Sequence, residues 1–248
     1  MKITLNEIIR HKKKEVAEKK KKSGRNFLER IVKPQIGDIG IIAEIKLASP
    51  TEEVLGHEKD VCSRAVIYGK AGADAISIVV DYKYFGGNLN FIREVKKTVS
   101  LPVLMKDFII DPFQIYEAKM NGADAVLLIA KILTATLLIN LVKLTESLGM
   151  IPIVEINNKD DRKKALKTRA LCIAVNSRDL STFQVDVDRA CQLIKSIPST
   201  RIVLGFSGVK GREEVEKYQQ AGAKAVLVGT SLMKVKNINQ LIKNLKGL

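Results

Sequence analysis

The sequence contains no tryptophan and only three cysteines, and aromatic residues make up 5% of it. So few aromatic side chains leave little for stacking against bases, which argues against a nucleic-acid-binding protein. The cysteines are odd in number and widely spaced, and no CxxC or Cys/His cluster occurs around Cys62, Cys172 and Cys191. We therefore expect neither a disulfide framework nor a metal site, and a reducing cytoplasm is the default location.

Long apolar runs and an excess of acidic residues are also missing. No run is long enough to cross a bilayer, and the amino-terminal segment is too charged for a secretory signal, so no membrane contact is expected. Lys and Arg number 42 against 27 Asp and Glu, which gives a net charge of +15. A basic excess can bind nucleic acid or steer an anionic small molecule. We favour a solvated, lysine-rich surface on a monomer whose partner is a small anionic substrate.

What is present is an alternation of strand-like and helix-like segments along the whole chain. Short apolar runs predict eight strands, at residues 41–46, 75–80, 102–106, 125–130, 151–156, 171–176, 201–206 and 225–229. Amphipathic stretches between them predict helices at 58–70, 88–98, 112–120, 135–148, 158–167, 186–196 and 211–220. Continuously apolar strands are typical of a parallel sheet that helices cover.

A weak internal repeat supports the same architecture. Three versions of one unit, AGADAIS, NGADAVLL and AGAKAVLV, contain Gly72, Gly122 and Gly222. A glycine in the left-handed conformation ends a helix before the chain turns into the next strand. Eight strand–helix units in about 250 residues predict an α/β fold, a single (β/α)8 TIM barrel. A doubly wound open sheet is the alternative, but the early GxGxxG turn that such folds use is absent.

Residues 1–40 precede the first predicted strand. We expect a helix from Thr4 to about Lys22, with Ile8, Ile9 and Val16 on one face, followed by a linker. This extra N-terminal helix is expected to lie across the barrel. The whole chain, 1–248, would then be one domain, with the barrel itself at 41–248.

Ionisable residues cluster where the predicted strands end. In a (β/α)8 barrel the active site lies at the carboxyl ends of the strands. Glu44 and Lys46 are two residues apart on one strand, so both should point into the barrel. A buried salt-bridge network is the alternative for any one of these residues, but several at the same end favour catalysis. The candidates are Glu44, Lys46, Lys106, Glu155 and Asn176.

Small residues end the last two predicted strands. Ser207-Gly208 and Gly229-Thr230 lack bulk, so backbone N–H groups there can approach a ligand. Loops after strands seven and eight of such barrels commonly bind phosphate beside the start of a short helix, which we expect at Thr230. Two ordinary tight turns are the alternative.

Longer motifs are IIAEIKLASP (41–50), PVLMKDFIIDPFQI (102–115), GADAVLLIAKIL (122–133), VEI (154–156), VNSRDL (175–180), SGV (207–209) and VLVGTSLM (226–233). In register from about residue 4 to the C-terminus, the chain resembles the indole-3-glycerol-phosphate synthase family of tryptophan biosynthesis. KDFIID and GTSLM are quite specific, whereas GADA alone is not. The resemblance implies a (β/α)8 barrel without a cofactor. It would be a carboxy-lyase that closes an anthranilate-derived amino-deoxyribulose 5-phosphate to an indole with loss of carbon dioxide and water.

The resemblance also implies roles for individual residues. Lys106 matches the general acid that protonates the ketose oxygen, Glu155 the base that assists dehydration, and Lys46 the cation that pairs with the substrate carboxylate. The supporting polar groups would be Glu44, Asn176 and Ser207. Substrate or phosphate binding would fall to Ser49, Arg178, Gly208, Gly229 and Thr230.

Three expected pocket positions depart from the family pattern. The family usually has an arginine at Leu47, a threonine at Val80 and an active-site glutamate at Phe206. A usually basic, glycine-bearing loop reads Thr51-Glu52-Glu53. These changes predict a more apolar mouth with two acids near an anionic substrate.

Two functions therefore stay open. The first is the family's carboxy-lyase activity. The second is a repurposed or engineered barrel in which a carboxylate abstracts a proton from a flat aromatic substrate, as in a Kemp eliminase. A Schiff-base lysine at Lys46 or Lys106, with aldolase-like activity, is a further alternative.

Overall fold

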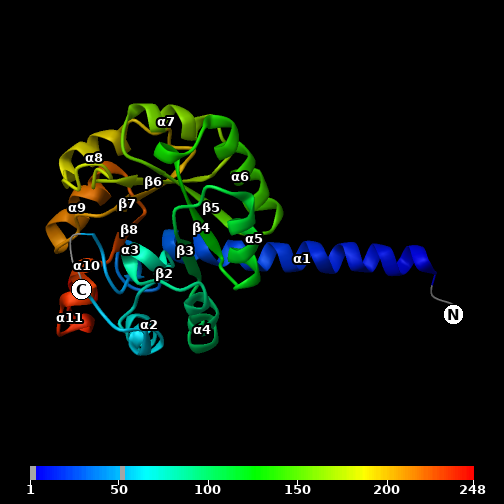
Figure 1. Cartoon of the computed structure of the whole chain (residues 1–248), viewed down its shortest axis with the longest axis horizontal. Helices are drawn as coiled ribbons and strands as arrows, with labels where there is room; N and C mark the ends of the chain where they lie inside the picture. Colours follow the sequence, from blue (N-terminus) through cyan, green and yellow to red (C-terminus); the bar gives the residue numbers. More distant parts are fainter. Residues whose placement is uncertain (1–3, 51–53) are drawn as a thin grey trace.

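The computed structural model describes residues 4–50 and 54–248. It is a closed barrel of parallel strands in sequence order, which confirms the predicted (β/α)8 fold (Figure 1). Every observed strand end lies within one residue of its predicted position. The strands are β1 (Gly40–Ile45), β2 (Ala75–Val79), β3 (Val103–Lys106), β4 (Ala125–Ile129), β5 (Ile151–Ile156), β6 (Cys172–Asn176), β7 (Ile202–Phe206) and β8 (Ala225–Val228).

Helices form at each predicted amphipathic stretch, and the short helix expected at Thr230 also forms. The helices after the first are α2 (Val61–Lys70), α3 (Tyr82–Phe85), α4 (Asn90–Thr98), α5 (Pro112–Met120), α6 (Ala135–Ser147), α7 (Lys159–Leu166), α8 (Val187–Lys195), α9 (Arg212–Ala221), α10 (Thr230–Lys234) and α11 (Ile238–Leu245). The described residues also form the 3-10 turns η1 (Glu58–Asp60) and η2 (Ala130–Ile132). The turn η1 begins the stretch predicted at 58–70, whereas η2, α3 and α11 were not predicted.

The repeated glycines have the conformation that the repeat predicts. Gly72, Gly122 and Gly222 follow α2, α5 and α9 with φ of 98°, 86° and 112°. This left-handed region is open to glycine and unfavourable for most other residues, so each glycine lets its helix stop and the next strand begin.

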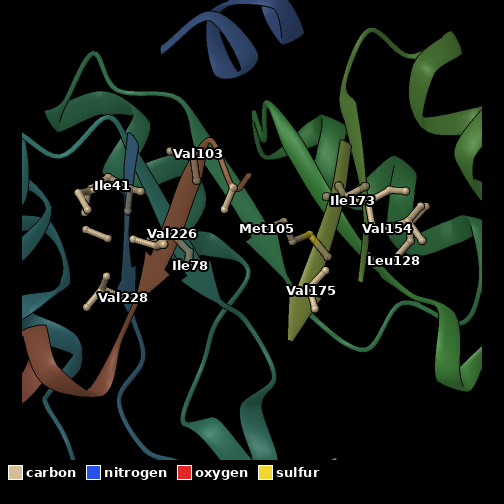
Figure 2. Close-up of a cluster of buried hydrophobic side chains, with 14 of the residues drawn as sticks. Ile41, Ile78, Val103, Met105, Leu128, Val154, Ile173, Val175, Val226 and Val228 are labelled. Atoms are coloured by element: carbon tan, nitrogen blue, oxygen red, sulfur yellow. The ribbon is translucent and has the colours of Figure 1, made fainter. Parts of the chain in front are cut away.

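The strand side chains form two apolar layers, because successive residues of a strand point to opposite faces. One layer lies between strands and helices, and Figure 2 shows part of it, including Ile41, Leu128 and Val226. The other layer fills the barrel interior and includes Ile42, Leu104 and other residues one position along. This alternation determines which polar side chains of the same strands can reach the inside of the barrel.

The first helix, α1 (Leu5–Val32), is longer than predicted, so the expected end near Lys22 is wrong. Phe27 and Ile31, four residues apart, are 0% exposed and pack into the interior layer at the amino end of the barrel. That burial extends the helix ten residues into the expected linker. Only this carboxyl-terminal part lies across the barrel, because the beginning of α1 projects away from it (Figure 1). Ile8, Ile9 and Val16 are accordingly exposed.

A buried ion pair joins the C-terminal end of the chain to the residue that precedes β2. Lys246, just after α11, has its Nζ 2.7 Å from Oδ2 of Asp74, and both side chains are almost completely buried. The same Asp74 oxygen accepts the backbone N–H of Ile41 at 2.8 Å. The pair therefore fastens the C-terminal helix to the amino end of β1.

Candidate active site

A cavity of about 810 Å³ opens at the carboxyl ends of the strands. It is the location that the strand-end residues predict. The predicted site residues that line it are Glu44, Lys46, Ser49, Lys106, Glu155, Asn176, Arg178, Phe206, Ser207, Gly208, Gly229 and Thr230.

The period of the strand places the charged groups inside the barrel. On β1, Ile42 belongs to the interior layer, so Glu44 and Lys46 continue the same face upward. Lys106 stands two residues after interior Leu104 on β3 in the same way. β1 and β3 thus each carry an apolar residue below and polar residues above, at the mouth of the barrel.

Glu44 joins the two lysines. Its Oε1 lies 3.0 Å from Nζ of Lys46 and its Oε2 lies 3.4 Å from Nζ of Lys106. The carboxylate is 3% exposed. Burial alone would raise the pKa of Glu44, but the charges of Lys46 and Lys106 outweigh it and lower the pKa to about 2. Glu44 is therefore a fixed anion between two cations.

Lys106 and Glu155 have pKa values that both lie above their ordinary values. Burial would lower the pKa of Lys106, but the carboxylates of Glu44 and Glu155 outweigh burial and raise it. Burial raises the pKa of Glu155, and Lys106 and Asn176 offset only part of that effect. Lys106 therefore stays protonated, and Glu155 binds a proton more readily than an ordinary glutamate. A cation and a carboxylate of this kind in one cavity are suited to acid–base chemistry.

Asn176 orients the Glu155 carboxylate. Its Nδ2 donates to Oε1 of Glu155 at 3.1 Å. The second oxygen, Oε2, is buried and has no hydrogen-bond partner among the described residues. A buried carboxylate oxygen without a partner is costly unless a ligand or a proton uses it.

Two tight turns face the charged groups. Ser207 and Gly208 follow β7 with φ of 67° and 75°, and both line the cavity. Gly229 and Thr230 follow β8, where α10 begins. The hydroxyl of Ser231 donates to the carbonyl of Val209 at 2.7 Å and so ties the two turns together.

The loop after β6 forms another wall. Arg178 pairs with Val185 across a small antiparallel bridge, and its Nη1 donates to the carbonyl of Phe183 at 3.0 Å. Arg178, Phe183 and Val185 all line the cavity. The guanidinium is thereby held at the mouth, where a cation can meet an anionic substrate.

Two expected pocket positions are wrong. Leu47 and Val80 do not line the cavity and belong instead to the outer layer between strands and helices. Lys46 and Val79 occupy the inward positions, so the next residue on each strand must point outward. Phe206 does line the cavity and is 1% exposed. Thr51, Glu52 and Glu53 lie outside the described residues.

Aromatic residues in the wall were missed by the sequence analysis. Phe85 and Phe108 line the cavity, with ring centroids 6.1 Å apart. The carboxylate of Asp81 accepts the N–H of Tyr84 at 2.8 Å and starts the one-turn helix α3 that carries Phe85. An Asp after a strand followed by a short aromatic run and Gly-Gly is a signal that could have indicated this wall.

Residues 4–50 and 54–248 contain neither a cluster of metal-binding side chains nor a membrane-spanning helix. No three His, Cys, Asp or Glu side chains there are arranged to hold a metal ion. None of the helices in the same residues is both long enough and apolar enough to cross a bilayer.

Fold and site together define a (β/α)8-barrel enzyme with lysine and glutamate side chains clustered at the carboxyl ends of its strands. A family model described as indole-3-glycerol phosphate synthase matches residues 3–245. The chain belongs to the indole-3-glycerol phosphate synthase family.

Relatives of that name are similar along nearly the whole chain. The protein from Thermoanaerobacter sp. (strain X514) is 39% identical over 259 aligned positions, which cover 99% of each chain. The protein from Carboxydothermus hydrogenoformans is 41% identical over 199 positions, covering 80% of this chain and 75% of the relative. These comparisons support the synthase and give no support to a repurposed, Kemp-eliminase-like or Schiff-base barrel.

Solved structures with a similar fold are more distant. A tryptophan synthase from Pyrococcus furiosus superposes with a TM-score of 0.65 at 17% identity, covering 86% of this chain and 100% of that chain. A 3-hexulose-6-phosphate synthase has a TM-score of 0.67 at 17% identity, covering 84% and 99%. At this identity the likeness shows the barrel fold alone.

Proposed function

We propose that this chain is an indole-3-glycerol phosphate synthase. It converts an anthranilate-derived amino-deoxyribulose 5-phosphate into indole glycerol phosphate, carbon dioxide and water. The observation that carries the proposal is that Lys106 and Glu155 line one cavity, where Glu44 contacts the ammonium at 3.4 Å and Asn176 donates to the Glu155 carboxylate at 3.1 Å.

Ring closure is the first step. A carbon–carbon bond forms between the ketose carbon and the ring carbon that bears the carboxylate, and Lys106 donates a proton to the ketose oxygen. The ammonium of Lys46 pairs with the substrate carboxylate until it leaves as carbon dioxide. The electron pair of the broken carbon–carbon bond then restores the aromatic ring. Glu44 keeps both lysines in place through contacts of 3.0 and 3.4 Å.

Dehydration completes the indole. The new hydroxyl leaves as water with a second proton from Lys106. The side chain of Lys106 is 25% exposed, so the amine regains the proton it gave to the ketose oxygen from solvent before this step. Glu155 takes a proton from the neighbouring carbon, and that electron pair becomes the indole double bond. The Asn176 amide holds Glu155 at 3.1 Å in the required orientation.

Phosphate binding is proposed for the two turns. The N–H groups of Ser207–Gly208 and Gly229–Thr230 would donate to phosphate oxygens, as small residues with exposed backbone can. Ser49 and Arg178 line the same cavity and would supply further polar contacts to the substrate. The net charge of +15 favours the approach of such an anionic substrate.

A steady-state assay tests the proposal. The amino-deoxyribulose phosphate is supplied to the wild type, Lys106→Met and Glu155→Gln, and indole fluorescence is followed. Removing a general acid or base is expected to lower kcat by roughly 100- to 10,000-fold. A folded wild type that makes no indole product would refute the function.

A further inference from the structure

The turn after β7 holds a residue in an unfavourable conformation. Ser207 has φ of 67°, in the left-handed region that few residues other than glycine adopt. Such a conformation persists only when surrounding contacts hold it. Something in the structure must therefore stabilise the Ser207–Gly208 turn.

Tyr218, on the second turn of α9, makes that contact. It is 0% exposed, and its hydroxyl lies 3.0 Å from the carbonyl oxygen of Ser207 and 3.1 Å from that of Phe206. A phenol has one proton, so the two carbonyls share it. The Phe206 carbonyl also accepts the N–H of Ser177 at 2.9 Å, which leaves the Ser207 carbonyl as the contact specific to the phenol.

The strand is shaped to admit the ring. A Cβ added at Gly205 would overlap the ring of Tyr218, so the position directly beneath the turn must lack a side chain. Burial raises the pKa of Tyr218, and the hydroxyl therefore keeps its proton and remains a donor at any ordinary pH.

Peptide geometry links this contact to the cavity. In a trans peptide the C=O and the N–H point in opposite directions. No peptide bond of the described residues is cis. If the phenol holds the Ser207 carbonyl on the α9 side, the N–H of Gly208 must point the other way, toward the cavity that Gly208 lines.

We propose that Tyr218 is a positioning residue of the phosphate site: its hydroxyl fixes the Ser207 carbonyl and so directs the Gly208 N–H at the substrate phosphate. The inference rests on the proposed function, since phosphate binding at this turn is part of it. Tyr218 touches neither substrate nor reacting atoms in this role.

The experiment measures inhibition of the purified enzyme by inorganic phosphate and by free anthranilate. Tyr218→Phe is expected to weaken phosphate inhibition and raise KM by about 3- to 10-fold, because one hydrogen bond is lost. Inhibition by anthranilate and kcat should stay near wild-type values. Tyr68→Phe is the matched control: Tyr68 is also 0% exposed, but its hydroxyl contacts the sulfur of Met233 at 3.4 Å.

A double-mutant cycle with Ser207→Gly separates positioning from general stability. Glycine adopts the left-handed conformation without strain, so the phenol should matter less in that background. Tyr218→Phe should then change phosphate inhibition by less than about 2-fold, a coupling that simple loss of core packing would not produce. If Tyr218→Phe alone does not fold, recovery of folding by adding Ser207→Gly supports the inference and failure to recover overturns it.

The outcomes distinguish the two proposals. A wild type that phosphate inhibits, with Tyr218→Phe no different from Tyr68→Phe, overturns the role of Tyr218 and leaves the synthase intact. Equal weakening of phosphate and anthranilate inhibition also overturns it, because the effect would not be confined to the phosphate turn. A folded wild type that shows no turnover refutes both the synthase function and the role of Tyr218 that rests on it.

Discussion

Gly229 lies directly against the carboxylate of Glu44. A Cβ added at Gly229 would overlap Oε1 of Glu44 and come within 3.3 Å of Nζ of Lys46. A side chain at this position therefore fits only if the Glu44 carboxylate moves away from the β8 turn. The turn proposed to bind phosphate thus lies against Glu44, which itself contacts Lys46 and Lys106.

Gly229→Ala is expected to lower kcat/KM by at least 10-fold, because the methyl group displaces Glu44 and disturbs both lysines. Steady-state kinetics measure this effect. Gly211→Ala is the control, since a Cβ there meets nothing within 4 Å and its φ is −160°. Equal kinetics for the two variants would contradict the proposed contact.

The rate should depend on pH in a bell-shaped manner. Glu155 must be deprotonated to act as a base, so kcat/KM rises with pH through a pKa above the ordinary 4.5. Lys106 must be protonated to act as an acid, so the rate falls again as pH passes a pKa above 10.5. Glu155→Gln should remove the acidic limb from whatever activity is left. An acidic limb that persists unchanged in that variant would assign it to another group.

Glu44→Gln should move the alkaline limb to lower pH. The carboxylate of Glu44 is one of the two charges that raise the pKa of Lys106 against burial, so its removal lowers that pKa. The exposed Glu58→Gln serves as control and should leave the limb in place. An unshifted limb in Glu44→Gln would mean that the network does not tune Lys106.

Glu44 also makes stability depend on pH. Its pKa is about 2 when folded and 4.5 ordinarily, so the stabilisation is complete above pH 4.5 and is lost as pH falls toward 2. Urea denaturation of wild type and Glu44→Gln across this window measures the difference. The two proteins should differ most at neutral pH and converge near pH 2.

Lys246→Met should destabilise the fold by about 3–5 kcal/mol, because it leaves the buried Asp74 carboxylate without its cation. The ion pair lies at the amino end of the barrel, so kcat should stay near the wild-type value. The exposed neighbour Lys243→Met should change the free energy of unfolding by less than about 0.5 kcal/mol. Urea unfolding followed by circular dichroism measures both, and equal stabilities would contradict the role of the pair.

The local pattern determined much of this protein. Apolar runs and the repeated glycines located every strand, because a buried parallel strand is apolar throughout and a left-handed turn favours glycine. Glu44 and Lys46 were placed on one inward face by the two-residue period of a strand. The same period, applied to Leu47 and Val80, would have placed both outside.

Other features depended on contacts between distant segments. The end of α1 was set by Phe27 and Ile31 reaching the barrel interior, and burial of this kind cannot be read from helix propensity. The hydrogen bond of Tyr218 to the Ser207 turn and the close approach of Gly229 to Glu44 likewise join residues far apart in the chain. The two-residue period of a strand determines on which face of the sheet a side chain lies. Only closure of the barrel brings β1 beside β8, and this closure decides that Gly229 meets Glu44.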